Sequence, residues 1–335
     1  ILDSLETENS FGTVCKNLTP GDDLTIKVEL DYSDDKNNKL IDGSAERTVN
    51  SLFGSTKKNT DGEITEINVS KVRHLNNLRK TIFKGANVKK GTQVVQTETI
   101  SFDWVDWKSE DYVSQWTKNP MEKFPAIDCG NLLNGGGYNG RGNVLKGFVF
   151  TGTNSGLFNS LDGAALTKMR FADCKSTGTN AGILAGSLIN CTVTDCGAYL
   201  NTKNKDNARY EDMDTRRKTY SVNGINSAGG LAAKISGGSL NYCFAAVDVS
   251  GGSNLGGLAG ITNGATIENS YASGNLSNSD RNDRNMGGLI GSMTGGNVNN
   301  CYATGKVYCT GRVAGGLIGV GHRTSGSVSN SVSYG

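Results

Sequence analysis

Short stretches of alternating apolar and polar residues fill the second part of the chain, and Gly or Asn separates one stretch from the next. Alternation with a period of two is typical of a β-strand that buries one face. No stretch there has the period of a long amphipathic helix, and the chain contains no apolar run of about 18 residues that could span a membrane. The pattern therefore predicts a series of short strands joined by tight turns.

These stretches belong to a repeat. Clear copies start with Gly-Gly-Leu at Gly229, Gly256, Gly287 and Gly315, and weaker copies start at Gly156 and Gly182. The clear copies start about 27 to 31 residues apart, a length that suits one coil of a solenoid. The sequence thus predicts an all-β fold, a parallel β-helix with about three short strands per coil. We expect it to be right-handed, because parallel crossover connections almost always adopt that hand.

The second half of each copy indicates which side chains face the interior. Two columns of small or apolar residues flank a middle column, and we place Cys191, Cys243 and Cys301 in the first small column, continued by Ser270 and Ser331. Side chains alternate between faces along a strand, so both small columns are expected inside a narrow coil. In-register thiols on neighbouring coils are poorly placed for disulfides. We expect these cysteines to be buried and free.

The middle column is then the outward one. It contains Phe244, Tyr271 and Tyr302, which we expect on one face with one ring per coil. Exposed apolar patches often mark contact sites, so these three residues are the candidate binding residues. Stacking of the rings between coils is the simpler interpretation, and it requires no ligand.

Another column consists mainly of Asn. It comprises Asn190, Tyr242, Asn269, Asn300 and Asn330. Asn tolerates bends and left-handed backbone, so we expect a corner of the coil here. Asn side chains stacked at such a corner can form hydrogen bonds along the solenoid axis.

The repeats resemble the GLUG motif, which is named for a Gly-Leu-any-Gly core. Residues 257–260, 288–291 and 316–319 match this core, and residues 269–274 and 300–305 match the Asn-Cys/Ser-Tyr-Ala-Thr/Ser-Gly run that follows it. GLUG repeats occur in large bacterial surface proteins, adhesin-like proteins and IgA-specific zinc metallopeptidases. The resemblance, over about residues 131–335, implies an extracellular or cell-surface protein, attached to the outer membrane, of a Gram-negative gut bacterium. It implies no particular reaction.

The first part of the chain differs in composition, because only 7 of the 46 Gly residues of the whole chain precede residue 130. We expect residues 1–62 to form a small β-containing segment with one strand at residues 24–30, and residues 131–335 to form the β-helix. Residues 63–130 are expected to hold a short capping helix and a Trp-rich connection with Trp104, Trp107, Tyr112 and Trp116. The helix is predicted by Ser70 followed by Val72, Leu75, Leu78 and Ile82.

Charge adds one feature. Lys+Arg 34 against Asp+Glu 32 leaves a net charge of +2, which argues against a nucleic-acid-binding protein. Charged residues of both signs cluster in residues 201–223, where one copy is about 20 residues too long. We expect an insertion that loops out of one coil without displacing it.

Candidate chemistry is sparse. The two His residues, His74 and His322, are far apart in sequence, and no His-Glu-x-x-His zinc motif occurs. The 8 Cys residues include no Cys-x-x-Cys pair. We therefore expect no catalytic residue, no metal and no cofactor.

The favoured function is a non-enzymatic cell-surface module for adhesion or as a stalk, with a host or bacterial glycan or protein as its partner. The alternative is a carbohydrate-active β-helix, a polysaccharide lyase or glycoside hydrolase, or a glycan-binding module. A lyase would place acidic calcium ligands and a basic proton acceptor on neighbouring coils. The charged insertion is the only sequence feature that favours such a site.

Overall fold

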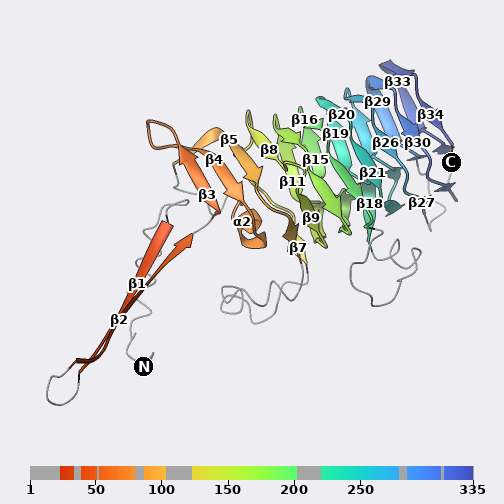
Figure 1. Ribbon diagram of the computed structural model, residues 1–335. Helices are drawn as coiled ribbons and strands as arrows, with labels where there is room; N and C mark the ends of the chain where they lie inside the picture. Colours follow the sequence, from red (N-terminus) through yellow and green to blue (C-terminus); the bar gives the residue numbers. More distant parts are fainter. Residues whose placement is uncertain are drawn as a thin grey trace, which may run out of the picture.

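The protein is an all-β parallel solenoid, as the repeat predicts (Figure 1). The structure is a computed structural model that describes residues 23–33, 39–50, 53–79, 87–102, 123–201, 220–278, 285–310 and 313–334, with only the backbone for residues 23–50. The four aromatic residues of the Trp-rich connection, together with Ile82 and Cys15, lie outside these ranges.

Three sheets run the length of the solenoid over the described residues. Sheet 1 has 10 strands: β7 (Phe124–Pro125), β10 (Val149–Ser155), β14 (Lys175–Ala181), β18 (Ser221–Gly229), β22 (Asp248–Gly251), β23 (Asn254–Gly256), β27 (Leu276–Ser277), β28 (Asn285–Gly287), β31 (Val307–Tyr308) and β32 (Val313–Gly315). Sheet 3 has 8 strands, one per coil: β6 (Ile100–Ser101), β9 (Val144–Lys146), β13 (Arg170–Ala172), β17 (Gly197–Tyr199), β21 (Phe244–Ala246), β26 (Tyr271–Ala272), β30 (Tyr302–Ala303) and β34 (Val332–Ser333).

Sheet 2 has 14 strands, because it follows two neighbouring sides of each coil. They are β3 (Ser55–Lys58), β4 (Ile64–Val69), β5 (Val88–Gln96), β8 (Gly137–Asn139), β11 (Phe158–Asp162), β12 (Ala165–Thr167), β15 (Ala185–Ile189), β16 (Thr192–Thr194), β19 (Ala232–Ser236), β20 (Ser239–Asn241), β24 (Ala259–Asn263), β25 (Thr266–Glu268), β29 (Ile290–Asn299) and β33 (Ile318–Ser329). The long strands β29 and β33 cover both sides without a break and so join them into one sheet.

Parallel pairing of each strand with its equivalent in the next coil holds the coils in register. In sheet 3 the pairs run from Gly197 to Phe244, from Phe244 to Tyr271 and from Tyr271 to Tyr302. Neighbouring coils are therefore about 4.8 Å apart, the usual strand separation. Parallel pairing begins before residue 131, since β4 pairs with β5 and β5 with β8.

The Gly-Gly-Leu sequences lie where one coil packs most tightly on the next. The side chains of Leu231, Leu258 and Leu289 are fully buried, and each backbone N–H donates to the equivalent Leu carbonyl of the following coil at 2.8 to 3.0 Å. A Cβ on Gly288 would overlap the carbonyl oxygen of Gly316, and one on Gly257 would overlap that of Gly288. The glycines therefore set the coil spacing, and the leucines fill the interior.

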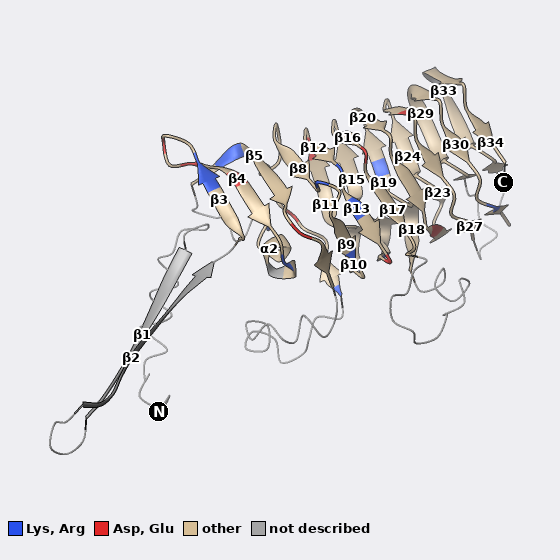
Figure 2. Cartoon of the chain, in the orientation of Figure 1, with Lys and Arg blue, Asp and Glu red and all other residues tan. Residues whose placement is uncertain are grey.

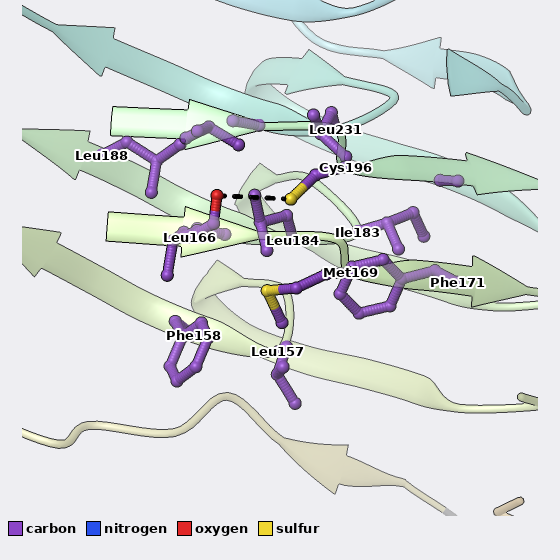
Figure 3. Close-up of a cluster of buried hydrophobic side chains, with 14 of the residues drawn as sticks. Leu157, Phe158, Leu166, Met169, Phe171, Ile183, Leu184, Leu188, Cys196 and Leu231 are labelled. Carbon is purple, nitrogen blue, oxygen red and sulfur yellow. Dashed lines mark hydrogen bonds between the residues drawn. The ribbon is translucent and has the colours of Figure 1, made fainter. Parts of the chain in front are cut away.

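The core changes character along the axis. Phe124, Phe148, Phe150 and Phe171 are buried and contact one another in sequence, with ring centroids 5.3 to 6.5 Å apart. Leu, Ile, Ala, Cys and Met fill the later coils, and Figure 3 shows where the two kinds of core meet. Phe171 is the last buried aromatic residue among those described.

The corner before sheet 3 is formed as predicted. Asn269, Asn300 and Asn330 adopt left-handed backbone with φ of 49°, 52° and 49°. The Asn300 Nδ2 donates to Asn269 Oδ1 at 2.6 Å, and the Asn269 Nδ2 donates to Asn241 Oδ1 at 2.8 Å. These bonds form the predicted ladder along the axis.

One assignment at this corner is wrong. Cys191 directly precedes strand β16 in sheet 2 and not β17 in sheet 3, because Thr192 pairs with Ser239 and not with Phe244. The ladder that contains Cys243, Ser270, Cys301 and Ser331 continues upstream to Cys196 and Met169. The corner residue of that coil is Asp195, with φ of 54°, rather than Asn190. The inward direction of the three predicted cysteines is correct, since Cys191, Cys243 and Cys301 are at most 2% exposed.

The predicted capping helix is present and short. Helix α2 (Val72–Asn76) is followed by a turn, and the side chains of Leu75 and Leu78 are fully buried against the first coils. Arg79 fixes this turn, because its guanidinium donates to the carbonyl oxygens of Pro125 at 2.6 Å and Ala126 at 3.0 Å. Strand β1 (Asp23–Ser33) contains the predicted alternating stretch and pairs antiparallel with β2 (Lys39–Asn50).

The coil continues after the charged insertion. Residues 202–219 lie outside the described part, and pairing resumes with Ser176 opposite Val222 and Gly178 opposite Gly224, although the register shifts between Gly178 and Asn180. Ser221–Asn223, the last three residues of the expected insertion, belong to strand β18.

Candidate functional site

The three candidate residues form a continuous stack on sheet 3. The ring centroids of Phe244 and Tyr271 are 5.3 Å apart with 10° between the ring planes, and those of Tyr271 and Tyr302 are 4.8 Å apart with 2° between the planes. Parallel pairing fixes this arrangement, because the three residues are direct partners on β21, β26 and β30. We call Phe244, Tyr271 and Tyr302 the aromatic ladder.

Stacking determines which part of each ring is available. The neighbouring rings cover both faces of Tyr271, so its edge and hydroxyl are what it presents to solvent. Phe244 lies over Gly197, where a Cβ would overlap the ring, and the Arg170 guanidinium lies 5.7 Å from the Phe244 centroid. Tyr302 is the most exposed ring of the ladder, at 40%. Beyond it the column continues with Val332, which is smaller than a ring.

The outward side chains directly beside the ladder are short and uncharged. Two residues further along each strand the outward residues are Ala246, Ser273 and Thr304, next to the three rings. Tyr199 precedes this second column, since it pairs with Ala246, and its ring centroid is 6.4 Å from that of Phe244. The rings therefore stand above a floor of small side chains.

An ion pair between Arg170 and Asp195 lies next to Phe244, the first ring of the ladder. The Arg170 guanidinium donates to both the side chain and the backbone carbonyl of Asp195. Arg170 pairs with Gly197 in the strand register, so its outward neighbour on the next coil is a glycine. The absence of a side chain on Gly197 gives Phe244 and the guanidinium the space to meet.

Figure 2 shows few charged residues along the coils, with the broadest Lys and Arg colouring on β3 and β5 at the first end of the solenoid. Within the described ranges, no three His, Cys, Asp or Glu side chains come together as metal ligands would. No helix in those ranges is both long and apolar enough to cross a membrane. The sequence feature that favoured a lyase, the charged insertion, falls almost entirely on residues 202–219, which are outside the described part.

The two His residues have different surroundings. His74 is buried on α2, and its Nδ1 accepts from the backbone N–H of Ser70 at 3.2 Å. His322 is exposed on β33, and its Nε2 lies 3.1 Å from the Oγ of Ser292 on the preceding coil. That Ser–His contact was not predicted, since the two residues are 30 positions apart and lie in different repeats.

The cysteines occupy structural positions. All seven described cysteines are free thiols, and all but Cys309 are buried. The thiols at the corners donate to the carbonyl two residues earlier: Cys243 to Asn241 at 3.4 Å and Cys301 to Asn299 at 3.2 Å, while the Ser270 hydroxyl donates to Glu268 at 2.6 Å. Figure 3 shows Cys196 turned toward the Leu166 carbonyl in the interior. This shared hydrogen bond explains why Cys and Ser replace each other in the repeat.

Alkaline pH is expected to destabilise the fold through these thiols. Burial raises the pKa of Cys129, Cys174 and Cys243 from 9.0 to about 12. Their contribution to stability is therefore complete below pH 9, and it is lost as pH rises from 9 toward 12, because the unfolded chain releases these protons first. The free energy of unfolding should fall by at most roughly 1.4 kcal/mol per pH unit for each such thiol.

Urea unfolding at pH 8, 9 and 10 measures this slope. Cys243→Ser is the matched variant, since Ser occupies the same corner at Ser270 and has no thiol to ionise. The variant should have a shallower slope than the parent chain. Equal slopes, or rapid alkylation of Cys243 in the folded protein at pH 8, would contradict the assignment.

The three parallel sheets and the aromatic ladder define the protein as a parallel β-solenoid with outward aromatic residues. The family model of the GLUG motif matches residues 251–277 and 282–308, so these two stretches are GLUG repeats. The first match contains Tyr271 and ends with strand β27, and the second contains Tyr302 and ends with strand β31.

The fold is also similar to a solved structure, the crystal structure at 1.30 Å of a putative immunoglobulin A1 protease from Bacteroides ovatus. The TM-score is 0.50 with 18% sequence identity, over 84% of this chain and 77% of that chain. At this identity the similarity establishes the shared fold and nothing about activity. Among curated proteins, none matches this sequence.

Proposed function

We propose that this chain is a non-enzymatic module of a bacterial cell-surface protein, acting in adhesion or as a stalk, with the aromatic ladder as its contact face. The observation that carries the proposal is the ladder itself. Three outward rings lie in register on a solenoid whose neighbouring outward positions are small or polar. Contiguous exposed aromatic surface on a soluble protein often marks a contact site.

The geometry limits how a partner would touch the ladder. Since the stacked rings cover each other's faces, the accessible groups are ring edges and the hydroxyls of Tyr271 and Tyr302. Tyrosine combines an apolar ring with a hydrogen-bonding hydroxyl, the combination found at many interfaces. A glycan or protein partner would therefore lie along the row of ring edges, with its polar groups at the hydroxyls.

Replacing Tyr271 and Tyr302 together with Ser is expected to abolish adhesion. The same change should lower the free energy of unfolding by only about 1 to 3 kcal/mol, since stacked aromatic pairs contribute about 0.5–1.5 kcal/mol each beyond the area they bury. Adhesion of protein-coated beads to epithelial cells and to bacteria, together with a glycan array, measures the first effect. Thermal unfolding measures the second.

Tyr308→Ser is the matched control, because Tyr308 is 56% exposed but lies on sheet 1 outside the ladder. It should leave adhesion unchanged. If the double variant stays folded and still adheres like the parent chain, the ladder is a scaffold and the proposal fails. Beads coated with the parent chain that adhere to none of these surfaces would also reject it.

One observation favours an enzyme as a second candidate, namely the contact between Ser292 and His322. A Ser–His pair is the core of several hydrolases, and a proteolytic role would agree with the name of the B. ovatus protein, a putative immunoglobulin A1 protease. Against this candidate, Ser292 is only 6% exposed, and the His322 side chain has no carboxylate hydrogen-bonded to it among the described residues that would orient the ring. Loss of hydrolysis of immunoglobulin A1 or of a polysaccharide in Ser292→Ala would establish this candidate.

A further inference from the structure

The interface between the coil of residues 175–199 and the coil of residues 221–246 differs from the interfaces directly before and after it, and we call it the central interface. The backbone pairing crosses it in all three sheets. The register nevertheless shifts in sheet 1, between Gly178 and Asn180. Gly178 and Asn180 are two residues apart, but their partners Gly224 and Ser227 are three residues apart. The perimeter of the coil thus grows by one residue at this point.

A ladder of Asn side chains in sheet 1 is interrupted at the same place. On the upstream side, the Asn180 Nδ2 donates to Asn154 Oδ1 at 2.8 Å. On the downstream side, the Asn285 Nδ2 donates to Asn254 Oδ1 at 2.9 Å. Ser227 occupies the position between them, and its hydroxyl donates to the carbonyl of Ala233 within its own coil at 2.8 Å.

Asn180 is left with an unused acceptor as a result. Its side chain is 8% exposed, and its Oδ1 makes no hydrogen bond with any described residue. A buried polar atom that has lost its water and gained no partner destabilises the folded state. An Asn at the position of Ser227 could donate to the Asn180 Oδ1, as Asn180 itself donates to Asn154. The unpaired acceptor therefore weakens the contact between these two coils.

Two outward side-chain ladders also begin at the central interface. The aromatic ladder starts at Phe244, opposite Gly197, and the corner Asn ladder starts at Asn241, opposite Thr194. The buried chain of phenylalanines ends one coil further upstream, at Phe171. The outward contacts that cross are a tilted pair of Tyr199 and Phe244 at 6.4 Å and the Arg170 guanidinium over Phe244, while the inward column continues across from Cys196 to Cys243.

We propose that the coils of residues 123–201 and those of residues 220–334 are two cooperative units that meet at the central interface. In solenoids, stability is the sum of the stability of each coil and of its contacts with its neighbours. An interface that keeps its backbone bonds and inward packing but interrupts the Asn ladder and both outward ladders is therefore where cooperativity breaks. The second unit opens first, because its core has no buried aromatic residue whereas the first unit has a continuous cluster of them.

This division gives a surface module a defined point of extension. A pulling force or partial denaturation would open the second unit, which contains the aromatic ladder, and leave the first unit folded. The inference concerns how the chain opens and is independent of what the ladder binds.

Native-state hydrogen exchange in low urea, read by mass spectrometry, tests the division directly. In the parent chain we expect the amides of β18–β34 to exchange with a common opening step, and those of β10–β17 to exchange at least 10-fold more slowly. A smooth gradient of exchange along the axis would overturn the proposal, as would a single rate for all coils.

A matched pair of core variants sharpens the test. Leu157 and Leu289 are both fully buried, and both occupy the Leu position of the repeat, one in each unit. Leu289→Ala should speed exchange about 30-fold or more in β18–β34 and leave β10–β17 unchanged, since Leu→Ala in a core costs at least about 2 kcal/mol. Leu157→Ala should do the reverse.

Should Leu289→Ala fail to fold, Ile290→Val provides a milder change in the same coil, with an expected increase of about 2- to 10-fold confined to β18–β34. An increase of equal size on both sides of the central interface, for either variant, would show that the solenoid is one cooperative unit.

Discussion

Gly288→Ala is expected to lower the free energy of unfolding by about 3 kcal/mol or more, although it adds a single methyl group. The added Cβ would overlap the carbonyl oxygen of Gly316 on the next coil and would lie 2.9 Å from the Cβ of Ala303. Both neighbours are held by strand pairing, so the methyl group can be accommodated only by separating the coils. Overpacking of this kind typically costs 1–3 kcal/mol, and more where the backbone cannot move.

Gly321→Ala is the control for this prediction. Gly321 lies on β33, no atom lies within 4 Å of the position that a Cβ would take there, and its backbone is not left-handed. Its unfolding curve in urea should therefore match the parent chain within about 0.5 kcal/mol. If both variants lost a similar free energy of unfolding, the backbone preference of glycine would explain why glycine is needed at position 288, and the close coil spacing would not.

Phe150→Ala is expected to cost about 3–5 kcal/mol, the usual effect of deleting a large buried aromatic side chain. Phe150 is fully buried, and its ring centroid lies 5.5 Å from that of Phe148 and 6.2 Å from that of Phe124. Phe244→Ala removes the same side chain from an outward, half-buried position and should cost about 1 kcal/mol. Urea unfolding of both variants compares them, and a loss for Phe244→Ala as large as that for Phe150→Ala would contradict the assignment of inner and outer faces.

The coil and its outward face could be predicted because the repeat is strong where the ladder lies. Tyr271 and Tyr302 belong to copies that share their Gly-Leu core, their corner Asn and their small inward residues. Each of these features follows from a constraint of the stacked coil: no space for a Cβ at Gly288, left-handed backbone at Asn269 and a narrow interior at Ala272. Sequence repetition therefore reports packing directly.

The register of the degenerate copies could not be predicted by the same reasoning. Asn190-Cys191-Thr192 has the composition of the corner before sheet 3, yet it forms a different corner one strand earlier, also with left-handed backbone. The true equivalent contains Asp195 and Gly197, which lack both the Asn and the ring. Two corners with the same conformational demand favour the same residue types, so composition alone does not separate them.

The sequence also could not predict side-chain contacts between coils. The Ser292–His322 pair, the unused acceptor of Asn180 and the meeting of Arg170 with Phe244 join residues from different repeats. Each depends on a register that only the stacked structure supplies. Stacking between coils was one interpretation of the row of rings, and the structure adds its geometry: near-parallel rings 4.8 and 5.3 Å apart present their edges, and not their faces, as the contact surface.

The central claim is that this solenoid holds a partner and does not transform it. The most direct measurement is mass spectrometry of a panel of host and plant polysaccharides and host surface proteins after prolonged incubation with the chain, with binding to each panel member measured in parallel. The account predicts at least one panel member that binds through the aromatic ladder and is recovered intact. A cleaved panel member, with cleavage lost in Ser292→Ala and retained in the double variant of Tyr271 and Tyr302, would contradict it.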